Sequence, residues 1–367
     1  MKENKIVLTG GHAGATAYAF IEELRKSKKN WDIYWIGTER ALEGRAVPTL
    51  EKAVFPKIGV KFVPIIAGRI QRRFTFYTIP SLFKIPIGFI HALILLLRIK
   101  PKIIVSFGGF ASFPVVVLGF FLGIPSIVHE QTVAYGLANK YSSFFATKVA
   151  LAREESKKYF KKSKCVITGN PVSKEILTLP KKTKKGEPPT LLITGGSRGS
   201  ENINAAVLTI LPKLLAKYKV VHQTGANQLS KVNKVREGLP LALKANYEVY
   251  GMVEPWNWYK LVNGADVIVS RAGANIVSEI IVAKRPSILI PIPWSYMDEQ
   301  TANAKFARDF GIARILSQEK LSPDSLLVEI EDIFKDWEGI IERVKGKESP
   351  DREASKRLVE LVEGSLK

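Results

Sequence analysis

The fold of this chain is decided by the stretch Ile6-Val7-Leu8-Thr9-Gly10-Gly11-His12 and by its counterpart Leu191-Leu192-Ile193-Thr194-Gly195-Gly196-Ser197-Arg198-Gly199. Each is an apolar run that ends in paired glycines and is followed by a helical pattern. In α/β proteins such a turn places backbone N–H groups and a helix N-terminus against an anionic ligand. The two threonines stand 185 residues apart, about the length of one domain. The repetition predicts two similar α/β domains with a cleft between them.

The size and composition describe a globular chain. It has 367 residues, of which 46% are hydrophobic and 24% charged, enough for two domains with cores of their own. Cys165 is the only cysteine, so no intramolecular disulfide can form and a reducing compartment is expected. The first residues lead directly into a strand pattern without the apolar region of a signal peptide, so we expect a cytoplasmic protein.

The positive charge is concentrated in one stretch. The formal net charge is +21, and no Asp or Glu occurs over the 78 residues from 52 to 129. Apolar side chains interleave there with ten basic residues, a pattern that favours an anionic lipid surface over nucleic acid, because base stacking needs only a few placed aromatics. The residues expected to contact a membrane are Arg69, Arg72, Arg73, Phe74, Phe76 and Lys84.

A transmembrane span is not expected. The 26 residues from Ile103 to Val128 carry no charge, which is long enough to cross a bilayer. Glycines and prolines interrupt them, however, and the pattern is more typical of a buried strand, a glycine turn, a helix and a second strand.

Short apolar runs alternate with helical patterns, which predicts parallel sheets with helices on both faces. The expected strands are 5–9, 32–37, 60–64, 103–106, 126–129, 148–151 and 164–168, then 191–194, 219–223, 247–250, 267–270 and 287–291. Charge, glycine and proline cluster in a linker at 181–189. We therefore expect an N-terminal domain over 1–180, a C-terminal domain over 190–350, and a closing helix over 351–367 that can pack back on the N-terminal domain.

The glycine turns carry the residues with chemical potential. His12 lies on the first turn, where its imidazole could take a proton from a hydroxyl or simply pack at the turn. The second turn offers amides, a hydroxyl and the Arg198 guanidinium, a set that suits a diphosphate. Neither turn has the spacing of a dinucleotide site or of an ATP-binding loop. Gly273 opens a further turn before a helix that carries Glu279, which could accept hydrogen bonds from a ribose diol.

Metal chemistry is not indicated. The four histidines, His12, His91, His129 and His222, lack the spacing of a zinc site, and no Asp-x-Asp occurs. We expect neither a metal nor a cofactor.

The ordered set of motifs resembles the MurG family, the UDP-N-acetylglucosamine:lipid I N-acetylglucosaminyltransferases of bacterial peptidoglycan synthesis. The resemblance extends from about Lys5 to Leu316 and is carried by Thr9-Gly10-Gly11-His12, Gly108-Gly109-Phe110, His129-Glu130-Gln131, Gly136-Leu137-Ala138-Asn139-Lys140, Gly169-Asn170-Pro171-Val172, Gly195-Gly196-Ser197 and Arg271 to Glu279. It implies the GT-B fold, two Rossmann-like α/β domains with parallel sheets separated by a cleft, and inverting transfer of N-acetylglucosamine to lipid I, which gives lipid II.

The resemblance also implies roles for single residues. UDP-N-acetylglucosamine would bind the C-terminal domain, with its ribose on Glu279 and its diphosphate on Gly196, Ser197, Arg198 and Gly199. The remaining donor contacts would be the backbone of Met252 or Val253 with uracil, Gln300 with the sugar, and Thr9, Gly10, Gly11, Arg271, Gly273, Ala274 and Asn275.

On the acceptor side, His12 matches the family's proposed base. Undecaprenyl-linked lipid I would lie in the N-terminal domain near Gly108, Gly109, Glu130, Gln131, Thr132 and Asn139. The basic apolar stretch matches the family's membrane face, which implies a peripheral protein on the cytoplasmic face of the membrane.

This chain departs from the family pattern at three places. Val7-Leu8 stands where the family usually has another glycine pair, Thr132 where it often has Asn or Asp, and Ser173 where it often has Arg. Two alternatives stay open from the residues alone: a related GT-B glycosyltransferase for another membrane lipid, and a non-catalytic membrane-surface binding module. A sugar-nucleotide epimerase is a third, although it would not need the basic apolar stretch.

Overall fold

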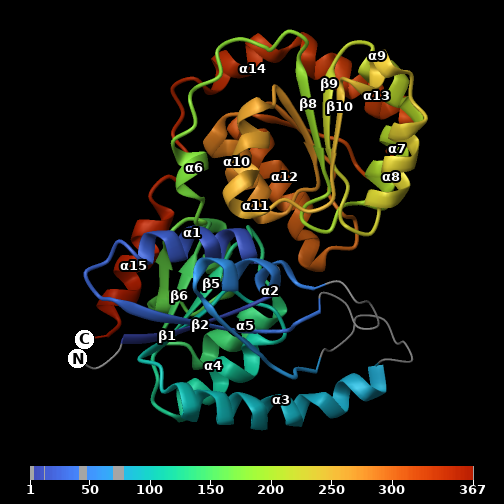
Figure 1. Ribbon diagram of the computed structural model, residues 1–367. Helices are drawn as coiled ribbons and strands as arrows, with labels where there is room; N and C mark the ends of the chain where they lie inside the picture. Colours follow the sequence, from blue (N-terminus) through green and yellow to red (C-terminus); the bar gives the residue numbers. More distant parts are fainter. Residues whose placement is uncertain (1–3, 12, 41–47, 69–77, 367) are drawn as a thin grey trace. The chain divides into compact units, whose positions relative to one another are not determined.

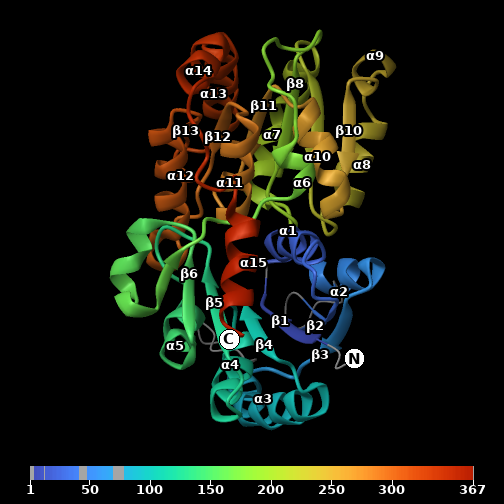
Figure 2. The same ribbon diagram turned by 90° about the vertical axis from the view of Figure 1, so that its left-hand side faces the viewer.

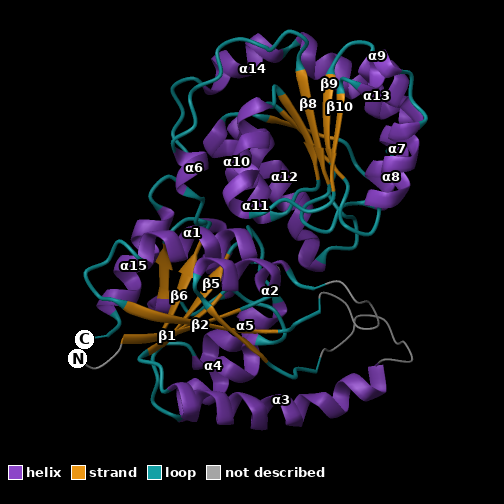
Figure 3. Ribbon diagram, viewed as in Figure 1, coloured by secondary structure: helices purple, strands orange, loops and turns teal. Residues whose placement is uncertain are grey.

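The computed structural model describes residues 4–11, 13–40, 48–68 and 78–366, with side chains from residue 84 onward in the helix that begins at Thr78. The chain forms two compact units: unit 1 comprises Met1–Ser173 and Pro350–Lys367, and unit 2 comprises Lys174–Ser349. Within each unit, parallel strands form one sheet with helices on both of its faces (Figure 3).

Unit 1 alternates strands and helices along the sequence (Figure 1). Its strands are β1 (Asn4–Thr9), β2 (Trp31–Gly37), β3 (Lys61–Pro64), β4 (Ile103–Ser106), β5 (Ser126–Glu130), β6 (Lys148–Leu151) and β7 (Cys165–Ile167). Its helices are α1 (Gly14–Leu24), α2 (Leu50–Val54), α3 (Thr78–Ile99), α4 (Ser112–Phe121), α5 (Leu137–Phe145) and the C-terminal α15 (Ala354–Gly364), with 3-10 turns at Phe55–Ile58, Glu154–Tyr159 and Lys162–Lys164.

The sheet of unit 1 has the strand order β3-β2-β1-β4-β5-β6-β7, all parallel. The central strands β1 and β4 read as nearly continuous apolar runs because helices cover both faces, and their Ile, Val and Leu side chains are fully buried. The order reverses between β1 and β4, so the turns that follow these two strands lie side by side at the same edge of the sheet.

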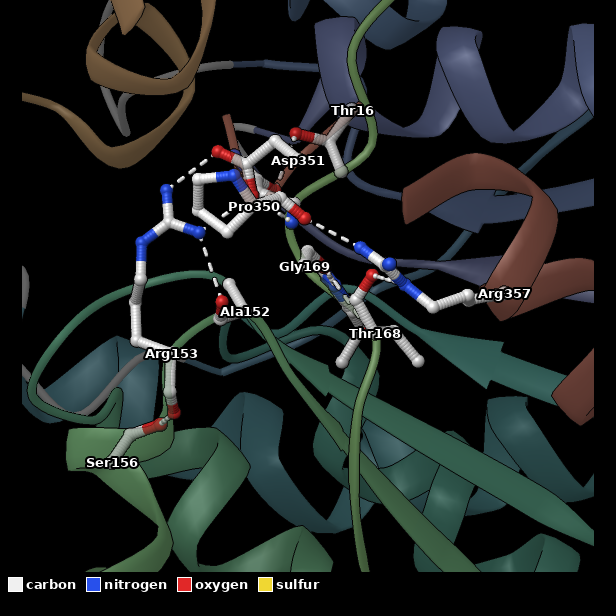
Figure 4. Close-up of polar contacts among 11 residues, drawn as sticks. Thr16, Ala152, Arg153, Ser156, Thr168, Gly169, Pro350, Asp351 and Arg357 are labelled. Atoms are coloured by element: carbon white, nitrogen blue, oxygen red, sulfur yellow. Dashed lines mark hydrogen bonds and ion pairs between the residues drawn. The ribbon is translucent and has the colours of Figure 1, made fainter. Parts of the chain in front are cut away.

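The end of the chain returns to unit 1 through a buried ion pair (Figure 4). Arg153 and Asp351 form a bidentate pair at 2.6 and 2.7 Å, and the backbone N–H of Asn170 donates to the same carboxylate at 2.8 Å. Arg357 of α15 donates to the carbonyl of Thr168 at 2.8 Å. Helix α15 thereby packs beside α1 (Figure 2).

Unit 2 repeats the same arrangement. Its strands are β8 (Thr190–Thr194), β9 (Lys219–Gln223), β10 (Tyr247–Tyr250), β11 (Val267–Ser270), β12 (Ser287–Leu289) and β13 (Ala313–Ile315), in the order β10-β9-β8-β11-β12-β13, all parallel. Its helices are α6 (Lys174–Leu177), α7 (Glu201–Leu215), α8 (Leu229–Glu237), α9 (Leu241–Lys244), α10 (Pro255–Gly264), α11 (Ala274–Ala283), α12 (Glu299–Phe310), α13 (Pro323–Lys335) and α14 (Trp337–Val344), with a 3-10 turn at Tyr296–Asp298.

The expected strands of both halves are present, and one strand was missed. The sequence reasoning gave the C-terminal domain five strands, whereas its sheet has β13 as a sixth. Helix α3 begins at Thr78 and continues through Pro86.

The segment 181–189 is held against unit 2. The buried carboxylate of Asp266 accepts from the backbone N–H of Gly186 and of Thr190 and pairs with the Lys182 ammonium at 2.8 Å. Lys185 pairs with Glu338 at 2.9 Å.

Candidate functional site

In both sheets the strand order reverses once, and this reversal marks where ligands bind in open α/β folds. The strand order reverses between β8 and β11 in unit 2, as it does between β1 and β4 in unit 1. Ligands of such folds bind outside the carboxyl ends of the strands next to this reversal. Most of the residues expected to bind the donor follow β8, β10, β11 and β12, so parallel pairing gathers them at one edge of the sheet of unit 2. Thr9, Gly10 and Gly11, also expected to contact the donor, lie at the end of β1 in unit 1.

The loop between β8 and α7 needs its glycines. Gly199 has φ +74°, and a Cβ there would lie 1.8 Å from the carbonyl oxygen of Thr224. A Cβ on Gly195 would lie 2.2 Å from the backbone nitrogen of Ser200. The loop therefore packs closely against the loop after β9, which fixes the path of its backbone.

Gly196 lies at the open side of the same loop. Its φ is +80°, and nothing lies within 4 Å of the position of a Cβ. Its N–H donates to the hydroxyl of Thr194 at 2.9 Å, and its carbonyl accepts from Gly199 at 2.8 Å. Ser197 and Arg198 are exposed here, so a hydroxyl and a guanidinium stand beside the N-terminus of α7, where an anion is favoured.

Arg271 holds this loop from within the unit. Its Nε donates to the hydroxyl of Ser200, the N-cap of α7, at 3.1 Å, and its other nitrogens donate to the carbonyl of Ile290 at 3.1 Å and to Gln318 at 2.6 Å. Burial lowers the pKa of this guanidinium to about 10. At least three of its N–H groups serve internal contacts, so the structure makes Arg271 a residue that positions the loops around the site.

Helix α11 begins after a glycine. Gly273 is its N-cap and has no side chain with which to cap the first turn, which Ala274 and Asn275 begin. The first turn also contains no acidic residue. The positive end of the helix dipole makes this end favourable for a phosphate.

Glu279 of α11 is a buried carboxylate with one hydrogen bond. Trp258 of α10 donates its indole N–H to Oε2 at 2.7 Å, the only hydrogen bond that the described residues give this carboxylate. Burial raises the pKa of Glu279 to about 7, and the Trp258 bond acts in the opposite direction. Sequence reasoning singled out Glu279 but missed Trp258, because no spacing connects two residues on different helices.

Two further expected donor contacts lie at the start of α12 and in the loop between β10 and α10. Gln300 accepts the N–H of Ile292 through its side-chain oxygen at 3.1 Å, which fixes the side chain and leaves its NH₂ group to donate. Met252 is exposed and Val253 half-buried in the loop between β10 and α10, where their backbone can meet a base.

In unit 1 the turn after β1, with Gly10 and Gly11, lies in contact with the turn after β4, with Gly108 and Gly109. The N–H of Gly11 donates to the carbonyl of Gly108 at 2.9 Å, and a Cβ on Gly109, at φ +93°, would lie 2.9 Å from the Gly11 nitrogen. Glu51 of α2 accepts the N–H of Ala13 at 3.0 Å and so supports the start of α1. Thr9 ends β1, and its hydroxyl oxygen is buried without a partner among the described residues. His12 lies outside the described residues.

Glu130 organises the loop after β5. Its Oε1 accepts from the backbone N–H and the hydroxyl of Thr132 at 3.0 and 2.9 Å, and its Oε2 accepts from Gly136 at 2.8 Å and from Asn139 at 2.9 Å. Gln131 donates to the carbonyl of Phe107 at 3.0 Å, which ties this loop to the turn after β4. Glu130, Thr132 and Asn139 are thus occupied with one another and shape the loop.

Unit 1 also presents an apolar surface, which we call the α3–α5 face. Its exposed members, on three helices, are Ile87, Ile90, Ile94, Leu97, Phe120, Phe121, Leu137, Tyr141 and Phe144. Of the residues expected to contact a membrane, Lys84 is half-buried at this face, and Arg69, Arg72, Arg73, Phe74 and Phe76 lie outside the described residues. The sequence reasoning did not extend this surface to α4 and α5.

The described part of the chain has no cluster of three or more His, Cys, Asp or Glu side chains that could hold a metal ion. Within the same residues, no helix combines the length and the apolar character needed to cross a bilayer.

The comparisons with known proteins agree with this arrangement. The glycosyltransferase family 28 N-terminal domain matches residues 6–151, and the glycosyltransferase family 28 C-terminal domain matches residues 190–358. The chain is similar to the UDP-N-acetylglucosamine--N-acetylmuramyl-(pentapeptide) pyrophosphoryl-undecaprenol N-acetylglucosamine transferase of Clostridium kluyveri, with 31% identity over 367 residues that cover 98% of this chain and 99% of that protein.

Solved structures confirm the GT-B-type fold. The crystal structure of MurG from Acinetobacter baumannii has a TM-score of 0.68 at 23% identity and covers 98% of this chain and 99% of that one. The UDP-GlcNAc 2-epimerase from Neisseria meningitidis, bound to UDP-GlcNAc, has the same TM-score at 16% identity, with coverage of 98% and 99%. The fold is therefore shared by transferases and epimerases, and fold alone does not choose between them.

Proposed function

The chain belongs to glycosyltransferase family 28, and we propose that it transfers N-acetylglucosamine from UDP-N-acetylglucosamine to undecaprenyl-pyrophosphoryl-N-acetylmuramyl-pentapeptide, lipid I, to give lipid II. The observation that supports this proposal is the similarity to the N-acetylglucosamine transferase of Clostridium kluyveri, which extends along 98% of this chain. The epimerases share the fold at lower identity.

Unit 2 binds the donor in this proposal. The open Gly196 and the exposed Ser197 and Arg198 take the diphosphate, together with Gly199, Gly273 and the first turn of α11, because N–H groups and positive charge meet there. Glu279 accepts from the ribose hydroxyls, the backbone at Met252 and Val253 meets uracil, and Gln300 donates to the sugar. Arg271 acts through Ser200 by holding the loop that carries these groups.

Unit 1 supplies the base and the acceptor site. His12 removes the proton of the C4 hydroxyl on the muramyl sugar, that oxygen forms a bond to C1 of the donor, and the bond from C1 to the diphosphate breaks. UDP leaves with its new charge stabilised by Arg198 and the amides of the β8–α7 loop, an electrostatic effect of the kind that dominates many enzymatic rates. A single displacement inverts the anomeric carbon. Gly108, Gly109 and Gln131 border the acceptor, and Glu130 shapes their loop.

The test is turnover with defined acceptors. We expect the purified chain to move radiolabelled N-acetylglucosamine from UDP to a soluble lipid I analogue with inversion at C1. His12→Ala should lower kcat by at least ~10²-fold, the typical contribution of a general base, while calorimetry still detects UDP binding. Transfer to diacylglycerol alone, epimerisation without transfer, or UDP binding without turnover would each assign the chain to one of the alternative functions.

The lipid acceptor also needs a membrane, and we propose that the α3–α5 face rests on it. This face exposes Phe120 and Phe121 at 53% and 70% of their surface. Arg98 and Lys100 are exposed at the end of α3. The three helices contain no Asp or Glu. Apolar area together with positive charge is what an anionic leaflet attracts.

Sedimentation with vesicles tests this face. Vesicles of phosphatidylglycerol should bind the chain, and about 0.5 M salt should weaken the binding because it screens the charges. Replacing Phe120 and Phe121 by Ser should reduce binding severalfold. Leu241→Ser is the matched control, since Leu241 is 86% exposed on unit 2. Equal binding by neutral vesicles, or an equal loss in the control, contradicts the proposal.

A further inference from the structure

The indole of Trp258 gives Glu279 an unusual environment. The carboxylate is nine-tenths buried, and it forms no ion pair with a described residue. Trp258 donates to Oε2 at 2.7 Å. The second oxygen, Oε1, accepts no hydrogen bond from the described residues and is not among the oxygens sealed from solvent. One oxygen is therefore fixed, and the other is left to accept from a ligand.

This arrangement costs stability unless a ligand completes it. A buried carboxylate normally receives several hydrogen bonds or a cation, because an incompletely paired charge is expensive to bury. Here the single donor is neutral, so the negative charge is not cancelled. A lysine or arginine in the same place would hold the carboxylate equally well, but it would compete with the hydroxyl groups of a ligand for the charge.

Tryptophan suits such a supporting role. Its indole N–H donates and cannot accept. It therefore holds Oε2 of Glu279 in place and leaves Oε1 to accept from another donor. Helix α10, which carries Trp258, begins with Pro255 after its N-cap Glu254. Met252 and Val253, the proposed contacts of uracil, lie just before this N-cap. The short segment from Met252 to Trp258 would then contact uracil directly and act on the ribose through Glu279.

We propose that Trp258 is a positioning residue of the donor site: its indole N–H holds one oxygen of Glu279 so that the other accepts from the ribose hydroxyls of the nucleotide. This proposal rests on the proposed function, in which Glu279 meets the ribose of UDP. It adds a residue on a different helix that acts through Glu279 without touching the nucleotide.

The experiment compares UDP with 2′,3′-dideoxy-UDP, which lacks both ribose hydroxyls, by calorimetry at pH 8. The wild type should prefer UDP. Trp258→Phe, which keeps the ring and removes the N–H, should weaken UDP binding about tenfold, as expected for loss of one hydrogen bond to a charged group, and leave the dideoxy analogue unchanged. Trp256→Phe on the same helix is the matched control and should change neither affinity.

A double-mutant cycle separates positioning from a general effect on the fold. In the Glu279→Gln background, Trp258→Phe should no longer change UDP binding. Equal weakening of both nucleotides, or the same loss in the Glu279→Gln background, would overturn the proposal. Failure of the wild type to bind UDP at all would instead remove the proposed function, so the two failures are distinguishable.

Discussion

Two buried glutamates, one in each unit, show how the same side chain serves different ends. Glu130 of unit 1 is 2% exposed and Glu279 of unit 2 is 9% exposed. Glu130 accepts four hydrogen bonds, which tie the loop that carries Thr132 and Gly136 to Asn139 of α5. Glu279 accepts one, from Trp258. A carboxylate that accepts four hydrogen bonds from its own chain stabilises the structure around it, whereas one that accepts a single bond can still accept others from a ligand.

The largest expected effect is on the stability of unit 1. Each oxygen of Glu130 accepts two hydrogen bonds. In Glu130→Gln the side-chain NH₂ group replaces one of these oxygens in either orientation of the amide, so two buried donors lose their acceptor. We expect the free energy of unfolding to fall by about 3 kcal/mol, measured by urea denaturation at pH 8. Glu279→Gln, the matched variant, should not lower it, because its neutral amide can still accept from Trp258. An equal decrease in the free energy of unfolding of the two variants would contradict the distinction between the two glutamates.

The stability of the protein should depend on pH through Glu279. Burial raises the pKa of Glu279 from 4.5 to about 7 in the folded protein. The folded state therefore binds more protons than the unfolded state between these values, and this carboxylate lowers the free energy of unfolding as pH rises through that window. At pH 4, below the unfolded pKa of 4.5, the wild type and Glu279→Gln should have nearly equal stability. At pH 8 the variant should be more stable by roughly 2 kcal/mol.

Urea denaturation of the wild type and of Glu279→Gln across pH 4 to 8 checks this difference. A stability gap between wild type and Glu279→Gln that stays constant with pH would mean that burial does not disfavour the charged form of Glu279.

The sequence predicts the strands and glycine turns because these depend on local patterns. Apolar runs that end in Thr9-Gly10-Gly11 and Thr194-Gly195-Gly196 mark β1 and β8, and the resemblance to a known family points to Glu279. Strand β13 was missed because Ala313–Ile315 is three residues long and has an arginine at its centre.

The partners of the two glutamates are not visible in the sequence. Trp258 precedes Glu279 by 21 residues, and only the fold brings the two side chains within hydrogen-bond distance. Glu130 was expected to contact the acceptor, and this stays a prediction; its four hydrogen bonds come from the loop after β5 and from Asn139 of α5, which the sequence did not show. Residue type and spacing identify a carboxylate, but only tertiary packing determines how many donors surround it.

The smallest effect should be on nucleotide affinity, and it decides whether the free capacity of Glu279 is used by the donor. Hydroxyl groups donate to the charged form, so UDP affinity should rise with pH through about 7 and Glu279→Gln should bind about tenfold more weakly at pH 8. The terminal phosphate of UDP titrates near pH 6, so calorimetry should follow the ratio of wild-type to variant affinity, in which this contribution cancels. The ratio should grow from near one at pH 5.5 to about ten at pH 8. A ratio that is large and constant would mean that Glu279 shapes the site without accepting from the ligand.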